Sequence, residues 1–396
     1  MRFSEVVGLQ YVKEHLVDLV QHNRLSHALL FLGRDGSGAL PLALAFAQYI
    51  TCEKVRHSRR DGGSSLFGEA EDTPVRMDAC GECSACLKAS QYAHPDIHYS
   101  YPVIAKKPGE KPVSTDYITA WREFLEHNPY GNAYEWLQYI GAENKQGNIT
   151  AEECNAIIHK LSLKSFESEY KVLIMWMPEY LNKEGNKLLK LIEEPPANTL
   201  FILVAENADA ILPTILSRCQ LVRIPKPETA EIESALLARG FPGQKATLAA
   251  GISDGNFREA LALAKEEGSN DWQGLLRDWL NALLKGGPVA QVKWIDHISK
   301  EGRESQKQFL QYFSHLLEQS VRLRVMGDAF TIADSEKDFA QRLNKMVDLS
   351  QQEAIAQELD KAAYYIERNA NPKMLFHALT IKLAHIIKDK ALILAD

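Results

Sequence analysis

The chain has 396 residues, of which 45% are hydrophobic and 24% charged, and its net charge is −7. This length accommodates two or three domains, and no apolar run approaches the ~20 residues that span a bilayer. The acidic balance argues against a protein whose main task is to grip nucleic-acid phosphates. The start of the chain lacks a secretory apolar segment, so we expect a cytoplasmic protein.

A glycine-rich loop follows the apolar run at residues 28–32 and precedes a helical pattern at residues 41–50. Strand, glycine-rich turn and helix N-terminus in this order are typical of a phosphate-binding loop, and Gly33-x-x-x-x-Gly38 has its spacing. Ala39 stands where that motif has its phosphate-binding lysine, and Leu40 where it has the hydroxyl that holds Mg²⁺.

We therefore expect a degenerate phosphate loop that binds no nucleotide usefully, although its backbone N–H groups could still attract an anion weakly. Its residues are Gly33, Gly36, Gly38, Ala39 and Leu40.

Three cysteines follow at two successive two-residue spacings, Cys80, Cys83 and Cys86, after a polar stretch at residues 53–79 that we interpret as a surface loop. Such spacing brings thiolates close enough to share one tetrahedral ion, and in a reducing compartment it favours a structural Zn²⁺. Cys52, at the end of the preceding helical pattern, is the natural fourth ligand. The alternatives are an unligated thiol cluster, an iron–sulfur cluster, and a Cys52 that is simply buried.

An aromatic insertion at residues 117–139 is expected to pack on the main domain, and no chemistry can be assigned to it. Thr150 to Glu153 is typical of a capping box that starts a helix through Leu161.

Apolar runs at residues 171–177, 200–205 and 220–224 alternate with helical patterns, which predicts an α/β domain with a parallel sheet covered on both faces. In phosphate-loop ATPases the strand at the place of residues 171–177 ends in carboxylates that hold Mg²⁺. Here residues 171–177 end in Trp176 and Met177, so a second part of the hydrolytic machinery is missing. From about residue 270 the patterns are helical.

Several motifs together resemble the AAA+ clamp-loader subunits of DNA replication. They are Leu188-Leu189-Lys190-x-x-Glu193-Glu194-Pro195-Pro196, then Ser217-Arg218-Cys219, the stretch 254–261 around Arg258, and the helix start at residues 371–376. The cysteine module after the loop helix is similar to that of the bacterial branch. The resemblance implies an AAA+ domain at 1–226 with a four-cysteine zinc module, a helical lid at 227–268 and a helical collar at 269–396.

Within that family, motor subunits keep the lysine and the acidic pair, whereas one subunit cannot hydrolyse ATP. This chain departs from the motor pattern at both places and resembles the non-hydrolysing subunit. The resemblance implies partners of the gamma/tau and delta types in a pentameric ring, contact with primed DNA and the sliding clamp through that assembly, and no membrane. It also implies membership of a holoenzyme with DNA-directed DNA polymerase activity.

In the family, the arginine of the Ser-Arg-Cys motif reaches ATP held by a neighbouring subunit, which assigns Arg218 as a finger acting in trans. The alternative for Arg218 is an ion pair within its own domain. Arg258 would contact the subunit's own nucleotide, or form a structural ion pair if that site is empty.

Two other functions remain open from the sequence. The first is a motor-type clamp-loader ATPase, which would need a Lys-Ser/Thr pair after a glycine-rich loop; none occurs near residue 33. The second is a zinc-dependent nucleic-acid-binding protein, against which the net acidity argues.

Overall fold

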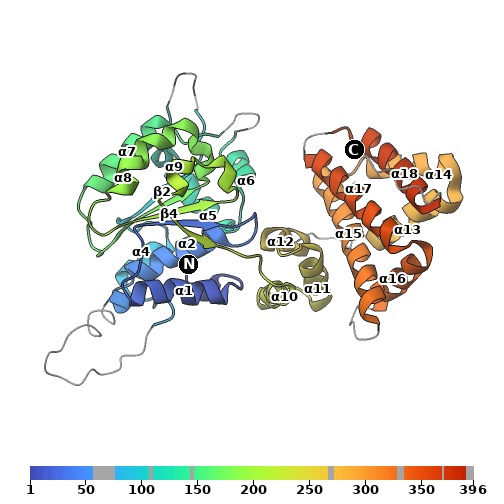
Figure 1. Cartoon of the computed structure of the whole chain (residues 1–396), viewed down its shortest axis with the longest axis horizontal. Coiled ribbons are helices and arrows are strands. Elements are labelled where there is room, and N and C mark those ends of the chain that lie inside the picture. The colour runs from blue at the N-terminus through green and yellow to red at the C-terminus, as the bar shows by residue number, and fades with distance from the viewer. Residues whose placement is uncertain are drawn as a thin grey trace. The chain divides into compact units, whose positions relative to one another are not determined.

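The computed structural model describes residues 1–56, 76–105, 107, 109, 111–142, 147–265, 272–327, 334–367 and 370–388. The chain forms two compact units (Figure 1), one of Met1–Ala250 with Asp254–Ala264 and the other of Gly251–Ser253 with Lys265–Asp396. The division into three domains at residues 226 and 268 stays a prediction. Of the polar stretch 53–79, residues 57–75 lie outside the described part, and residues 53–56 are helical.

The first unit is built on a five-stranded sheet in the order β2-β3-β4-β1-β5, and every neighbouring pair is parallel. The strands are β1 (Ala28–Leu32), β2 (Ile97–Ser100), β3 (Lys171–Trp176), β4 (Thr199–Ala205) and β5 (Gln220–Arg223). The predicted parallel sheet is confirmed. Strand β2 was not predicted, because its four residues include a histidine and a serine and form no apolar run.

Both faces of this sheet are buried. Alternate residues of β1, β3 and β4 enter two apolar clusters: Phe31 and Ile202 belong to one, and Leu30 and Leu203 to the other. Figure 1 shows α1 (Gln10–Gln21) and α2 (Ala39–Thr51) on one side of the sheet. On the other side it shows α7 (Ala151–Ser162), α8 (Leu189–Glu193) and α9 (Pro213–Leu216).

The other helices of this unit are α4 (Ser84–Ser90), α5 (Ile118–His127), α6 (Ala133–Tyr139), α10 (Thr229–Ala238), α11 (Gly243–Ile252) and α12 (Phe257–Lys265). Short 3-10 segments occupy Phe3–Glu5, Ser114–Tyr117, Pro178–Leu188 and Ala208–Ala210.

Two predictions about individual elements are met in the structure. The hydroxyl of Thr150 accepts a hydrogen bond from the N–H of Glu153 and so starts α7 at the predicted place. The aromatic insertion forms α5 and α6, and its side chains pack on the sheet domain as predicted. Trp121 stacks on Tyr101 with ring centroids 4.1 Å apart and lies 5.2 Å from the ring of Trp176.

All regular secondary structure in the described residues of the second unit is helical. Its helices are α13 (Trp272–Asn281), a π-helical turn (Ala282–Gly286), α14 (Gly287–Ile298), α15 (Arg303–Met326), α16 (Asp334–Met346), α17 (Leu349–Glu367) and α18 (Pro372–Lys388). Trp279 and Trp294 stack at its centre with ring centroids 4.6 Å apart. The stripe that contains Phe309 and Phe313 is fully buried, so it forms the unit's own core. Among the described residues no helix combines the length and apolar character that a membrane crossing requires.

Candidate functional site

The glycine-rich loop at residues 33–38 forms a tight turn at the start of α2. Gly36 and Gly38 have φ angles of +71° and +90°, a backbone region that residues other than glycine rarely adopt. Gly38 is the N-cap of α2, and the N–H of Gly33 donates to the carbonyl of Ala205 on β4 (3.0 Å). A Cβ at Gly36 would lie 1.7 Å from Oδ1 of Asn256. The loop is therefore packed directly against the start of α12.

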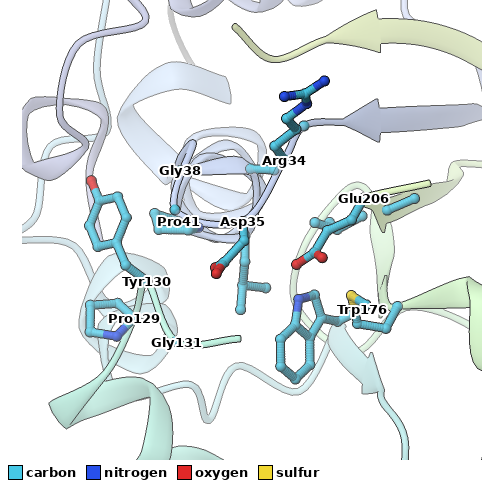
Figure 2. A pocket seen from close by; sticks show the side chains of 16 residues that line it. Arg34, Asp35, Gly38, Pro41, Pro129, Tyr130, Gly131, Trp176 and Glu206 are labelled. Atoms are coloured by element: carbon cyan, nitrogen blue, oxygen red, sulfur yellow. The ribbon is translucent and has the colours of Figure 1, made fainter. Parts of the chain in front are cut away.

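Figure 2 shows the side chains that line the space in front of the loop. A cavity of about 30 Å³ remains, which is room for one or two water molecules. Ala39 and Leu40 are buried side chains of α2, and Trp176, Met177 and Tyr130 also line the cavity. Ligand pockets generally have about 300–1,000 Å³, so this cavity is far smaller than a typical ligand pocket.

Carboxylates surround the loop. Figure 2 shows Asp35 and Glu206 at the cavity, whereas Arg34 points away from it. Although the Glu206 side chain is partly exposed, desolvation and the negative charges of Asp35 and Glu179 raise its pKa to about 7. Glu179, the first carboxylate after β3, accepts hydrogen bonds from the N–H groups of Glu206 and Asn207 (2.7 and 2.9 Å). These acidic groups would repel a phosphate.

Arg258 of α12 forms ion pairs with Asp35 of the loop and with Glu135 of α6. Its guanidinium lies 3.1 Å from Asp35 and 3.0 Å from Glu135, and the N–H of Phe257 donates to the carbonyl of Gly36 (3.1 Å). Its side chain is only 16% exposed, so the pair with Asp35 is largely screened from solvent. A structural ion pair is one of the two roles that the sequence suggests for Arg258, and a contact with the subunit's own nucleotide is the other. The Asp35 carboxylate binds the Arg258 guanidinium, which is then not free to bind a phosphate.

Glu206 should make stability depend on pH. Its pKa is raised in the folded protein from 4.5 to about 7, so its stabilising contribution is complete below pH 4.5 and is lost as pH rises through 7. Relative to a Glu206→Gln variant, the wild type should therefore lose free energy of unfolding as pH rises over this range. Urea unfolding of both proteins at pH 5, 6, 7 and 8 measures the difference, with Asp209→Asn as an exposed-carboxylate control. Parallel profiles for wild type and Glu206→Gln would contradict the assignment.

The four predicted cysteines come together. The sulfurs of Cys52, Cys80, Cys83 and Cys86 all lie within 4.8 Å of one another, and those of Cys80 and Cys86 are 3.8 Å apart. Cys52 is the C-cap of α2, and Cys83 is the N-cap of α4. Backbone N–H groups donate to three of the sulfurs: Cys80 N–H to Cys52 (3.4 Å), Cys83 N–H to Cys80 (3.4 Å) and Cys86 N–H to Cys83 (3.5 Å). These four residues can hold one metal ion.

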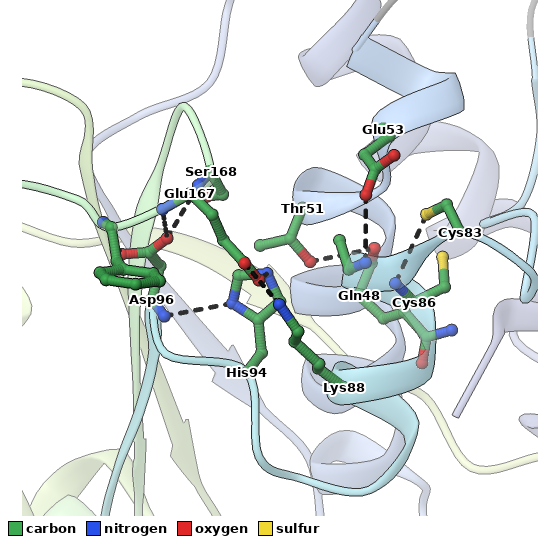
Figure 3. Close-up of polar contacts among 12 residues, drawn as sticks. Gln48, Thr51, Glu53, Cys83, Cys86, Lys88, His94, Asp96, Glu167 and Ser168 are labelled. Carbon is green, nitrogen blue, oxygen red and sulfur yellow. Dashed lines mark hydrogen bonds and ion pairs between the residues drawn. The ribbon is translucent and has the colours of Figure 1, made fainter.

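A polar network links α4 to the start of the sheet (Figure 3). Lys88 and His94 both contact the carboxylate of Glu167, at 2.5 and 3.2 Å. Nδ1 of His94 accepts the N–H of Asp96 (3.1 Å), so its proton lies on Nε2, and burial lowers the pKa of His94. The buried Asp96 carboxylate accepts N–H groups from residues 166–168. The cysteine module is thus anchored to the domain through α4.

Arg218 lies at the surface, just after α9. Its Nε donates to Oε1 of Glu193 (2.6 Å), its Nη2 also contacts that oxygen, and its Nη1 donates to the carbonyl of Thr214 (2.7 Å). The side chains of Arg218 and Glu193 are 31% and 45% exposed. In the single chain, Arg218 therefore forms an intrachain ion pair while remaining accessible from outside.

The sequence did not identify four acidic residues of these sites, namely Asp35, Glu135, Glu193 and Glu206. Glu193 stood within a recognised motif without an assigned role. Asp35 and Arg258 are separated by 223 positions, and single acidic residues carry no spacing that could indicate such a contact.

Comparison with known proteins places the chain among replication proteins. A profile for the family described as DNA polymerase III, delta subunit, matches residues 8–228. DNA polymerase III subunit delta' of Bacillus subtilis is 25% identical over 65% of this chain and 59% of its own length. Subunit tau of the same organism is 25% identical over 74% of this chain and 42% of its own length, and subunit delta' of Escherichia coli is 26% identical over 71% of both. The chain thus spans only about half the length of the first two relatives.

Solved structures give a weaker likeness. A DNA polymerase III gamma subunit-related protein of Thermotoga maritima is 14% identical with a TM-score of 0.36, covering 93% of this chain and 98% of that one. The RuvB Holliday junction branch migration motor of the same organism has 14% identity and a TM-score of 0.35, covering 80% and 77%. These scores are too low to define a common arrangement of the whole chain.

Proposed function

Because this chain belongs to the DNA polymerase III delta-subunit family, we propose that it is a delta-prime-type clamp-loader subunit that hydrolyses no ATP itself. In this proposal it joins gamma/tau-type and delta-type subunits in a pentameric ring that loads the sliding clamp onto primed DNA. The relatives include both delta' and tau subunits, so the family alone does not separate a passive subunit from a motor. Our distinction between these two kinds of subunit rests on the glycine-rich loop at residues 33–38.

The observation that carries the proposal is the filled and acidic phosphate loop. Ala39 and Leu40 provide neither a cation for phosphates nor an oxygen for Mg²⁺. The cavity of about 30 Å³ and the carboxylates of Asp35 and Glu206 oppose a bound triphosphate by volume and by charge. A motor-type ATPase would need a cation for the phosphates, an oxygen for Mg²⁺, a larger cavity and no carboxylates facing the phosphates. The ion pair between Arg258 and Asp35 holds α12 against the loop without a nucleotide.

In this proposal Arg218 supplies the chemistry that the chain's own loop has lost. An arginine presented to a neighbour's ATP stabilises negative charge that develops on the transferred phosphoryl group. Two features suit Arg218 to this role. Its side chain is partly exposed, and its backbone directly follows the C-cap residue of α9 in the motif Ser217-Arg218-Cys219. The ATP would be bound by the neighbouring subunit and not by this chain.

We also propose that Cys52, Cys80, Cys83 and Cys86 hold a structural Zn²⁺. A tetrahedral Zn²⁺ with bonds of about 2.3 Å keeps its sulfurs about 3.8 Å apart, which is the separation of Cys80 and Cys86. Four protein ligands leave no open coordination position, so the ion would stabilise the module without taking part in a reaction.

Titration of the isolated chain with ATP and Mg²⁺ tests the absence of nucleotide binding. We expect no saturable heat of binding at ATP concentrations up to ~1 mM, since the loop offers no favourable contact for the phosphates. ADP should give the same result. A magnesium-dependent ATPase that purifies with the chain and is lost when Gly36 of the loop is changed would contradict the proposal in favour of the motor-type alternative.

A further inference from the structure

The contact between Arg218 and Glu193 is more specific than a chance surface pair. Glu193 is the last residue of α8, and Arg218 follows α9. Ile192 and Ile215, next to the ends of these helices, are both buried in the same apolar cluster. Pro195 and Pro196 prevent α8 from continuing. The carboxylate and the guanidinium therefore face each other from two short elements that are fixed to one core.

The carboxylate occupies the edge of the guanidinium that is best suited to bind an anion. Both Nε and Nη2 of Arg218 contact Oε1 of Glu193, and Nη1 is held by the carbonyl of Thr214. Carboxylates and phosphates bind the same planar fork of an arginine. A phosphate that approached Arg218 through this edge would have to compete with Glu193.

The pair contributes little to folding. Its side chains are 31% and 45% exposed, and exposed ion pairs are generally worth about 0–1 kcal/mol because water and salt screen them. A contact of this strength can be exchanged for a stronger one at small cost. The γ-phosphate of ATP carries more negative charge than a carboxylate and offers three oxygens to the fork.

We infer that Glu193 is a positioning residue that holds Arg218 in an intrachain pair and releases it when a neighbour's ATP presents its γ-phosphate. This inference rests on the proposed function of Arg218 as a finger in trans. Before ATP arrives, the carboxylate keeps the long arginine side chain in one place and neutralises its charge. The exchange costs part of the binding free energy of ATP, and a nucleotide without a γ-phosphate displaces Glu193 poorly.

The test uses Glu193→Gln in a clamp loader reconstituted with its partner subunits. Glutamine keeps the shape of the side chain and removes the charge, so it competes less with phosphate. We expect the half-saturating ATP concentration of the clamp- and DNA-stimulated ATPase to fall by up to about fivefold, the range set by an exposed ion pair, with kcat within about twofold of wild type. Glu194→Gln is the matched control, because it removes the adjacent exposed charge, and it should leave both parameters unchanged.

A double-mutant cycle separates this role from a merely structural one. In an Arg218→Ala background, Glu193→Gln should have no further effect on the half-saturating ATP concentration, since the competing partner is gone. The inference is contradicted if Glu193→Gln behaves like Glu194→Gln, or if it lowers kcat at an unchanged half-saturating concentration. If Arg218→Ala alone leaves the ATPase intact, the proposed finger itself is wrong, whatever Glu193 does.

Discussion

Replacing Cys86 with serine should abolish metal binding and destabilise the first unit strongly. The Cys86 side chain is fully buried, and its sulfur lies 3.8 Å from that of Cys80. Binding of a structural Zn²⁺ contributes ~10 kcal/mol or more in small zinc-dependent peptides, so its loss from this larger domain should cost several kcal/mol. We expect about one zinc per wild-type chain by elemental analysis, none in Cys86→Ser, and a large drop in the denaturation midpoint of the variant.

Cys219→Ser is the matched control, because it removes a thiol that lies outside the cluster. It should retain the zinc and most of the stability. A chelator should lower the melting temperature of the wild type and not that of Cys86→Ser. Wild-type protein that contains iron and sulfide would favour the iron–sulfur alternative, and protein that is stable and free of metal would favour an unligated cluster of thiols.

The sheet could be predicted from sequence because its strands are buried on both faces. Strands β3 and β4 are continuous apolar runs, and such runs stand out from the amphipathic helical patterns between them. Strand β2 has no such run, and only its pairing with β3 defines it. The cysteine cluster could be predicted for a different reason, since two successive short spacings restrict where the thiols can lie.

The chemistry around the loop could be predicted only in part. The missing lysine and hydroxyl are visible at Ala39 and Leu40, because the motif fixes their positions. Glu206 directly follows β4, and only the parallel pairing of β1 with β4 brings it to the loop. Nothing local indicates that its carboxylate and that of Asp35 share one small space. Contacts of this kind depend on the register of the sheet.

Trp176 ends β3 at the position where phosphate-loop ATPases carry a carboxylate, and here it has a packing role. Where an ATPase of this type has a carboxylate, the indole packs within 5.2 Å of Trp121 and joins the aromatic core of the insertion. The sequence showed both the missing carboxylate and the aromatic insertion, without connecting them. A carboxylate restored at residue 176 would have to enter this apolar cluster unpaired, which is costly.

Arg218→Ala in a reconstituted clamp loader should give the largest functional loss in this account. If Arg218 serves one neighbouring ATP site, hydrolysis at that site should fall by about 10³-fold or more, the range found for arginines supplied in trans. The isolated variant should fold normally, because its ion pair with Glu193 is exposed. Arg218→Lys keeps the charge and loses the planar fork, so it should restore little activity.

Single-turnover hydrolysis with wild-type, Arg218→Ala and Arg223→Ala chains measures this effect most directly, and Arg223 serves as another exposed arginine of the same domain. The account predicts that the Arg218→Ala loader assembles and binds ATP, yet leaves the nucleotide at one site unhydrolysed, whereas Arg223→Ala matches wild type. If the Arg218→Ala loader hydrolyses the same number of ATP molecules at the wild-type rate, the chain contributes no catalytic group to its neighbour and the central claim is wrong.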